Sequence, residues 1–300
     1  MKFSGSSLLE NSSTTPELTP PMSGRFLPSK VICASILIVL SLFNAVLAQE
    51  DFDETGPDAL IIYDVRGDTL LNPQENPAAA TDAELEDIMF DRAYHEVLWQ
   101  DFTELIPLRY RTSITKLAIY TDGEEELLAS VTPNPDNVDT WTLALDALDG
   151  TYMGDELIHT LIHEFGHILT LSAEQVPRSP EVLESDDTLF KSVEGACNTF
   201  FTGEGCSGQS SYINAYFQRF WVNIYFQSLE LESGELFELY PEQFVTEYAA
   251  ENPGEDIAEA WTFFVLQDKP TGSSVADQKV RFFHAYPELV KLRELIRAKL

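Results

Sequence analysis

The stretch DELIHTLIHEFGHILTL, residues 155–171, carries three of the chain's five histidines at intervals of four residues. On a helical wheel its aliphatic and aromatic side chains fall in one sector, and His163, Glu164 and His167 fall in the opposite one. We therefore expect an amphipathic helix whose apolar side packs on a sheet and whose polar side lines a cleft. Histidines that served only the core would lie among the apolar residues, and these do not.

The spacing of the polar residues indicates a metal site. His163 and His167 lie one helical turn apart, so both imidazoles can reach one ion, and neutral imidazole is a good zinc ligand. Glu164 would face a water in the remaining coordination position and take its proton. The pattern matches H-E-x-x-H of zinc-dependent peptidases, so we predict one Zn²⁺ per chain. A third ligand from the preceding turn would crowd one side of the ion, so His159 is expected to line the cleft or to support a ligand.

The third protein ligand has to come from another part of the chain. The extended pattern H-E-x-x-H-x-x-G-x-x-H is excluded, because Thr170 and Ala173 stand where it needs Gly and His. In the stretch ENPGEDIAEAWTFFVL, residues 251–266, Glu255 and Glu259 lie one turn apart on a helix that is otherwise apolar nearly all round. Such a helix is buried, and buried carboxylates need partners. A metal ion would be the partner of Glu255, and a ligating histidine would be the partner of Glu259.

An alternative remains open for the first of these carboxylates. Asn252, Pro253 and Glu255 also fit the N-cap, N1 and N3 positions of a helix, so Glu255 could close a capping box. That interpretation leaves Glu259 without a partner, and we favour the metal.

Composition restricts the class of protein. A chain of 300 residues with 44% hydrophobic residues can bury one substantial core, or at most two. Its formal charge of −32 argues against partners that attract Lys and Arg, which are nucleic acids and anionic membrane surfaces. We expect a peptide or protein substrate, no nucleic acid, and no stable membrane association unless the N-terminal segment is retained.

The first 48 residues resemble an export signal. A Ser, Thr and Pro-rich opening, residues 4–24, is expected to be disordered. Arg25 and Lys30 then precede an apolar run, residues 31–48, that ends in Ala48 before a polar start. This order predicts a signal peptide cleaved after Ala48, and hence a secreted or extracytoplasmic protein. The alternative is an uncleaved membrane anchor, since the run is barely long enough to span a bilayer.

Export also changes the interpretation of the cysteines. Cys33 would leave with the signal segment, so Cys197 and Cys206 remain as an even pair in an oxidising compartment. A disulfide between them is expected, with two free thiols as the alternative.

The order of predicted elements favours an α+β domain. Residues 49–300 form a single domain with an acidic leader through about Pro57. A helix over residues 81–105 begins at Thr81, with Glu84 completing a capping box. Three short strands follow, bounded by turn residues at "DG" and "TPNPDN". The half beyond Asp155 is mainly helical. The strands are expected at residues 114–121, 126–131 and 140–148, and the later helices at 212–227, 253–267, 275–285 and 287–299.

These motifs also resemble those of a known family. The chain resembles the exported zinc metallopeptidases of the gluzincin type, and more distantly the catalytic domain of anthrax lethal factor. The resemblance lies in HEFGH, followed further on by EYAAENPGEDIAEAW and KVRFFHAYPELVKLRELI. The resemblance covers roughly residues 140–300. It implies a zincin-like domain, in which a small mixed or antiparallel sheet packs on a zinc-binding helix.

The resemblance also implies roles for single residues. His163, His167 and Glu255 would be the zinc ligands, Glu164 the general base, and Glu259 a supporting residue behind the ligands. Tyr248 would donate a hydrogen bond to the oxyanion of the tetrahedral intermediate.

The resemblance extends to the strand before the motif helix. Residues 140–148 are similar to the edge strand that pairs with an extended peptide in such peptidases, although an interior strand fits the same pattern. The segment 172–244, which includes both cysteines, departs from the family, so no specificity carries over.

The sequence therefore predicts an exported zinc metallopeptidase that hydrolyses peptide bonds. One alternative is a non-catalytic secreted or membrane-anchored binding protein that keeps a zincin-like fold. Another is a membrane-anchored acidic ectodomain in which HEFGH occurs by accident.

Overall fold

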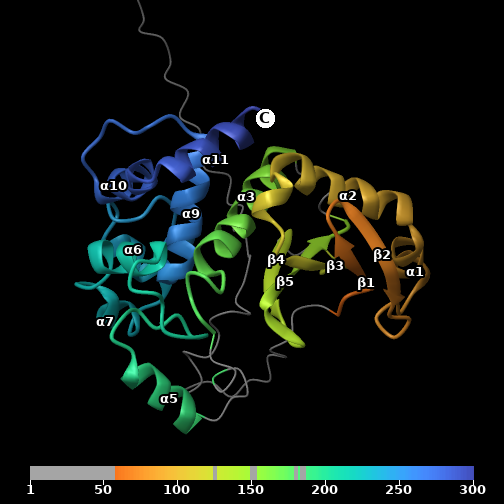
Figure 1. Ribbon diagram of the computed structural model, residues 1–300, viewed down its shortest axis with the longest axis horizontal. Coiled ribbons are helices and arrows are strands. Elements are labelled where there is room, and N and C mark those ends of the chain that lie inside the picture. Colours follow the sequence, from red (N-terminus) through yellow and green to blue (C-terminus); the bar gives the residue numbers. More distant parts are fainter. Residues whose placement is uncertain (1–57, 124–126, 149–153, 179–181, 183–186) are drawn as a thin grey trace, which may run out of the picture. The chain divides into compact units, whose positions relative to one another are not determined.

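The computed structural model describes residues 58–123, 127–148, 154–178, 182 and 187–300 (Figure 1). All of them belong to one compact unit, Ile32–Leu300. The predicted signal segment, residues 1–48, and the acidic leader to Pro57 lie outside the described residues. Within the described part of the chain, no helix has both the length and the apolar character needed to cross a membrane.

A five-stranded mixed sheet forms the N-terminal half of the described chain, in the order β2-β1-β3-β5-β4. β3 and β5 are parallel, and the other neighbouring pairs are antiparallel. The predicted α+β class is confirmed. The hairpin of β1 and β2, which turns at Gly67 with a φ of +65°, was not predicted. The strands are β1 (Ile61–Arg66), β2 (Thr69–Glu75), β3 (Ile114–Tyr120), β4 (Ala129–Asn134) and β5 (Asn137–Asp146).

The strand before the motif helix lies inside the sheet. β5 pairs with β3 on one side and β4 on the other, so the prediction that residues 140–148 form an edge strand is wrong, and the edge is β4. The predicted turn over residues 132–137 is also too long, because β4 continues through Pro133 to Asn134. Pro133 is tolerated there since its missing N–H faces away from β5.

The alternation of hydrogen bonds along β4 gives this orientation. The N–H of Asp146 donates to the carbonyl of Leu128, so residues 130 and 132 also bond to β5. Residues 129, 131 and 133 therefore direct their backbone polar groups toward the free edge, and proline at an edge strand costs no ladder hydrogen bond.

The helical segment after the first hairpin is divided in two. α1 (Ala83–Phe90) and α2 (Arg92–Leu105) replace the single predicted helix over residues 81–105. The first cap is Asp82 and not Thr81, because the Asp82 carboxylate accepts from the N–H groups of Glu84 and Leu85. Asp91 caps α2 through the N–H of Tyr94 and so interrupts the run.

The C-terminal half is mainly helical, as predicted. The predicted helix 212–227 is divided into α6 and α7, and the end of the predicted helix 275–285 is a 3₁₀ turn. The α-helices are α3 (Gly154–Leu171), α5 (Asp187–Ala196), α6 (Tyr212–Phe220), α7 (Tyr225–Ser228), α8 (Ser233–Leu239), α9 (Pro253–Leu266), α10 (Val275–Phe282) and α11 (Pro287–Arg297). The 3₁₀ turns are η2 (Leu108–Tyr110), η4 (Tyr248–Ala250) and η5 (Phe283–Ala285).

The motif helix α3 contacts β4 and lies alongside α9 (Figure 1). Its apolar side chains share one core with those of the sheet, as predicted. Its polar side does not line an open cleft, because α9 covers it. His163 and Glu164 are each 2% exposed and His167 is 8% exposed.

A glycine of the motif allows α3 and α9 to approach closely. A Cβ at Gly166 would lie 3.0 Å from Cδ1 of Trp261, 3.2 Å from Cα of Ala258 and 3.3 Å from its Cβ. The backbone of α9 cannot give way as a flexible side chain would. Gly166 and Ala258 therefore bring the polar side chains of the two helices within contact distance.

The Cys197–Cys206 disulfide expected from the sequence is present in the structure. It closes a loop in which Phe201 and Cys206 form a single antiparallel bridge.

Substitution at Gly166 tests the close helix contact. We expect Gly166→Ala to lower the free energy of unfolding by about 1–3 kcal/mol through overpacking, despite the higher helix propensity of alanine. Gly195→Ala, on α5 with open space around it, is the matched control and should be neutral or stabilising by up to about 1 kcal/mol. Urea unfolding of both variants measures the difference. Equal effects at the two glycines would contradict the packing argument.

Candidate metal centre

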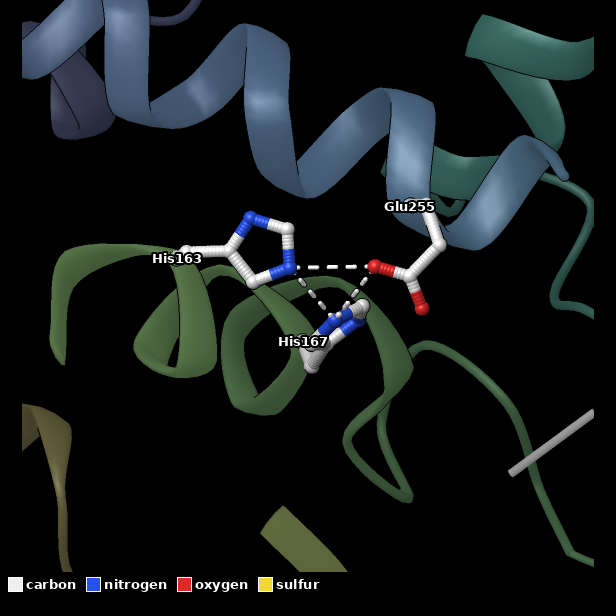
Figure 2. Close-up of side chains that lie close together, drawn as sticks. All are labelled: His163, His167 and Glu255. Carbon is white, nitrogen blue, oxygen red and sulfur yellow. Dashed lines mark hydrogen bonds and ion pairs between the residues drawn. The ribbon is translucent and has the colours of Figure 1, made fainter. Parts of the chain in front are cut away.

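Three side chains from α3 and α9 converge on one point (Figure 2). Nε2 of His163 lies 3.0 Å from Nε2 of His167 and 3.0 Å from Oε2 of Glu255. Nε2 of His167 lies 3.3 Å from the same Oε2. The structure therefore brings together the two histidines and the glutamate predicted as ligands, although 92 residues separate His163 from Glu255.

The triangle of donor atoms fits a tetrahedral zinc ion. Bonds of about 2.0–2.1 Å place the ligand atoms of such an ion about 3.3 Å apart, since a tetrahedron's edge is about 1.6 times its radius. The observed separations are 3.0, 3.0 and 3.3 Å. Two imidazoles and one carboxylate also form a donor set typical of catalytic zinc, which leaves the fourth position for water or substrate.

The hydrogen bond at Nδ1 of His163 orients the other ring nitrogen, Nε2, toward the centre of the triangle. Nδ1 of His163 lies 2.9 Å from Oε1 of Glu259, and an ionised carboxylate only accepts hydrogen bonds, so Nδ1 carries a proton. In the neutral imidazole, Nε2 then presents a lone pair to the lone pairs of Glu255 and His167. Such a convergence of acceptors needs a cation or an additional proton at its centre.

Glu259 is itself held in place. Thr246 Oγ1 donates to Oε2 of Glu259 at 2.7 Å and accepts from the N–H of Ala249 at 3.1 Å. Nε2 of His159 lies 3.9 Å from Oε1 of Glu259, and the imidazole ring meets Phe263 edge-on. Glu259 and His159 therefore lie behind the candidate ligands, as predicted from the sequence, and Thr246 is a further member of this group.

The start of α9 decides how Glu255 is used. Asn252 is the N-cap and accepts from the N–H groups of Gly254 and Glu255, with Pro253 at the first helical position. Asn252 and Pro253 therefore occupy the N-cap and N1 positions that the capping-box alternative assigned to them. The Glu255 carboxylate, however, contacts His163 and His167. The backbone of Glu255 belongs to the cap, and its side chain belongs to the cluster.

The electrostatics follow from burial and from these contacts. Burial raises the pKa of Glu255, but the charge of His167 and the hydrogen bond from His163 outweigh it, so the pKa lies below its usual range. Burial lowers the pKa of His163, and its hydrogen bonds to Glu255 and Glu259 outweigh that effect and raise the pKa well above normal. The cluster thus favours positive charge at its centre.

Tyr248 and Glu164 lie beside the same cluster. The ring of Tyr248 is 5.6 Å from that of His163, centroid to centroid. Its buried hydroxyl faces Glu255 without the geometry of a full hydrogen bond. Burial and the charges of Glu255, Glu251 and Glu164 raise the pKa of Tyr248 well above normal. The hydroxyl therefore stays protonated at neutral pH, close to the Glu164 carboxylate.

Three buried or half-buried acids near the cluster were missed from sequence. Burial and the charge of Glu255 raise the pKa of Glu251 to about 7. Asp256 forms a fully buried ion pair with Lys279 at 2.6 Å and accepts from Trp221 Nε1 at 2.6 Å. Glu204 is paired with Arg178 at 2.7 Å. The signal for Asp256 was its place on the apolar helix between two acids already identified as buried.

Comparisons with known proteins add little to this geometry. No family profile matches the chain, and no curated protein is significantly similar to it. Among solved structures, it is similar to that of a "putative zinc-binding metallo-peptidase" from Bacteroides caccae ATCC 43185, at 16% identity and a TM-score of 0.33. The alignment covers 69% of this chain and 77% of the other. Similarity at this level does not establish a shared fold.

Metal analysis tests the donor set directly. We expect the purified chain to contain one zinc ion, and His163→Ala and Glu255→Ala to lose it because each removes one of three donors. His159→Ala should retain zinc, since its imidazole lies behind Glu259 and not in the triangle. Inductively coupled plasma mass spectrometry measures the content. Zinc retained without Glu255 would return that residue to a capping role.

A second test concerns the groups behind His163. Glu259→Gln should weaken zinc binding about 10–100-fold, since residues that orient a ligand are worth that much. Thr246→Val should weaken it in the same direction through Glu259. Thr262→Val is the matched control, because the Thr262 hydroxyl donates to the carbonyl of Ala258 on its own helix. Competition with a chromophoric chelator measures the dissociation constants. If Thr246→Val and Thr262→Val had equal effects, Thr246 would have no special role.

Proposed function

We propose that this chain is an exported zinc metallopeptidase with a zincin-like domain of the H-E-x-x-H, gluzincin type. The observation that carries the proposal is the triangle of His163, His167 and Glu255, with Glu164 and Tyr248 beside it. The dimensions of the triangle suit zinc, and the two further groups are those that peptide hydrolysis needs. The resemblance of the motifs to gluzincins agrees with the same assignment.

The chemistry divides among a few groups. Zinc at this position would polarise a peptide carbonyl and lower the pKa of a water molecule. Glu164 would take the proton of that water and pass it to the leaving amine. Tyr248 would donate its hydrogen bond to the carbonyl oxygen as negative charge develops there. Glu259 would hold His163 in the tautomer that presents Nε2.

The edge of the sheet is where we propose that a peptide substrate pairs. β4 is an edge strand in contact with α3, so an extended peptide paired with it would lie close to the motif helix. Ala129 and Val131, whose backbone groups point to this edge, are 0% and 4% exposed, so the pairing requires the part of the chain that covers them to move. On this condition, the role first expected for residues 140–148 is proposed for β4.

Export is proposed on two grounds. The N-terminal pattern is that of a signal peptide, and the Cys197–Cys206 disulfide suits an oxidising compartment. Retention of the apolar segment as an anchor is the alternative, and it would place the same domain at a membrane surface.

A zinc-binding protein without catalysis is the second candidate function. The burial of the donors favours it, since Glu255 is 6% and His163 2% exposed and structural zinc sites are closed. The general base distinguishes the two candidates, because a structural site has no use for Glu164.

Two substitutions separate catalysis from metal binding. Glu164→Gln should retain zinc and reduce peptide hydrolysis about 10²–10⁴-fold, because the base is lost. Tyr248→Phe should retain zinc and lower kcat about 10²–10³-fold, because one oxyanion donor is lost. Cleavage of a proteome-derived peptide library, followed by mass spectrometry, measures the activity. Glu238→Gln and Tyr240→Phe, on and beside α8, are controls that should change neither quantity. A zinc-loaded chain that cleaves no peptide would support the binding protein.

A further inference from the structure

Arg178 ties its own segment to three others beside the candidate metal centre. Its side chain is fully buried. Nη1 donates to the carbonyl of Val138 on β5 at 2.7 Å, and Nη2 donates to that of Leu171 at 3.0 Å. Nε donates to Oε2 of Glu204 at 2.7 Å, and the guanidinium stacks over Trp141 at 4.3 Å. The carbonyl of Leu171 ends α3, one turn beyond His167.

The partner of Arg178 belongs to the loop that the disulfide closes. Glu204 lies two residues before Cys206, and its carboxylate is buried with Arg178. Gly205 runs so close to residue 177 that a Cβ there would lie 2.4 Å from the carbonyl oxygen of Pro177. The N–H of Thr202 donates to the carbonyl of Gly205 and tightens the loop tip. The loop therefore packs on the segment that follows α3.

Glu204 is also close to the second histidine of the motif. Burial raises the pKa of Glu204, and the charges of Arg178 and His167 act against this rise. The pair thus joins the last turn of α3 to the disulfide loop, and Glu204 neutralises the charge of Arg178.

We propose that Arg178 and Glu204 are positioning residues for His167, and that the Cys197–Cys206 disulfide holds them in place. Zinc affinity then depends on a loop that supplies no ligand. The disulfide limits the positions that Glu204 can occupy, Glu204 keeps Arg178 neutralised, and Arg178 holds the end of α3 that carries His167. This inference rests on the metal site of the proposed function and assigns a role to a segment outside the motifs.

A matched cluster elsewhere in the fold separates this role from general stability. Arg111 is likewise buried, donates to the carbonyls of Ile106 and Gly67, pairs with Asp68, and lies over Trp99. It ties the turn between β1 and β2 to the end of α2, and the four partners named here all lie outside α3. Loss of Arg111 should therefore reduce stability and leave the metal centre unchanged.

The test measures the zinc dissociation constant of folded protein by chelator competition. Glu204→Gln and the double variant Cys197→Ser/Cys206→Ser should each bind zinc about 10–100-fold more weakly than the native chain. Arg111→Met should lower the melting temperature without a change in zinc affinity beyond about twofold. The absorption spectrum of the cobalt-substituted protein gives a second readout, and its d–d bands should shift in the first two variants only.

The outcomes distinguish this inference from the proposed function. If the native chain binds no zinc, the proposed function and the positioning role are both wrong. If the native chain binds zinc and Glu204→Gln binds it equally well with the same cobalt spectrum, the metal site stands and the positioning role is overturned. Equal losses of affinity in Arg111→Met and Glu204→Gln would overturn it too, because stability alone would then account for the effect.

Discussion

The close contact between α3 and α9 is the constraint on which the candidate site depends. Gly166 has no side chain and Ala258 has a single methyl group, so the two backbones approach near the histidines. A larger residue at this crossing would push apart the two helices that carry His163 and Glu255. Glycine is a weak helix former, yet here it allows the approach that the site requires.

Burial of charge is the second physical theme of the structure. α9 carries three buried acids, Glu255, Asp256 and Glu259, each exposed by 6% or less. Glu255 contacts the histidine pair, Asp256 pairs with Lys279, and Glu259 contacts His163 and Thr246. A buried ion pair adds little stability in itself, but the loss of one partner is costly. Such a helix therefore tolerates few arrangements of its neighbours.

Much of the site could be predicted from local patterns. The four-residue spacing of His163 and His167 required only a helix, and Glu255 and Glu259 stood out because most of the remaining helix is apolar. The cover over the polar face could not be predicted, since amphipathicity distinguishes two faces without showing what packs on each. Arg178 and Glu204 were missed for a similar reason. Charged residues in a loop are usually expected to be exposed to solvent. The buried pairing of Arg178 with Glu204 arises only in the tertiary structure.

The sheet was predicted less completely, and particular residues account for this. Asn72, with a φ of 49°, and Pro73 break the alternating pattern of β2, so the first hairpin lacked a clear strand signal. Asp91 caps α2 and so interrupts a continuous helical periodicity that predicted one helix. The neighbours of β5 are set by long-range pairing, which a local sequence pattern does not contain.

Pro133 has a consequence for association between copies of the chain. An exposed edge strand is a template on which a second molecule can add its own strand and begin an aggregate. On β4, the proline removes one of the outward N–H groups, so a long continuous ladder with another copy cannot form there. On the same strand, Ala129 and Val131 are 0% and 4% exposed, so their outward backbone groups are already covered. Burial at one end of this edge and a proline at the other therefore both protect it against pairing with another copy.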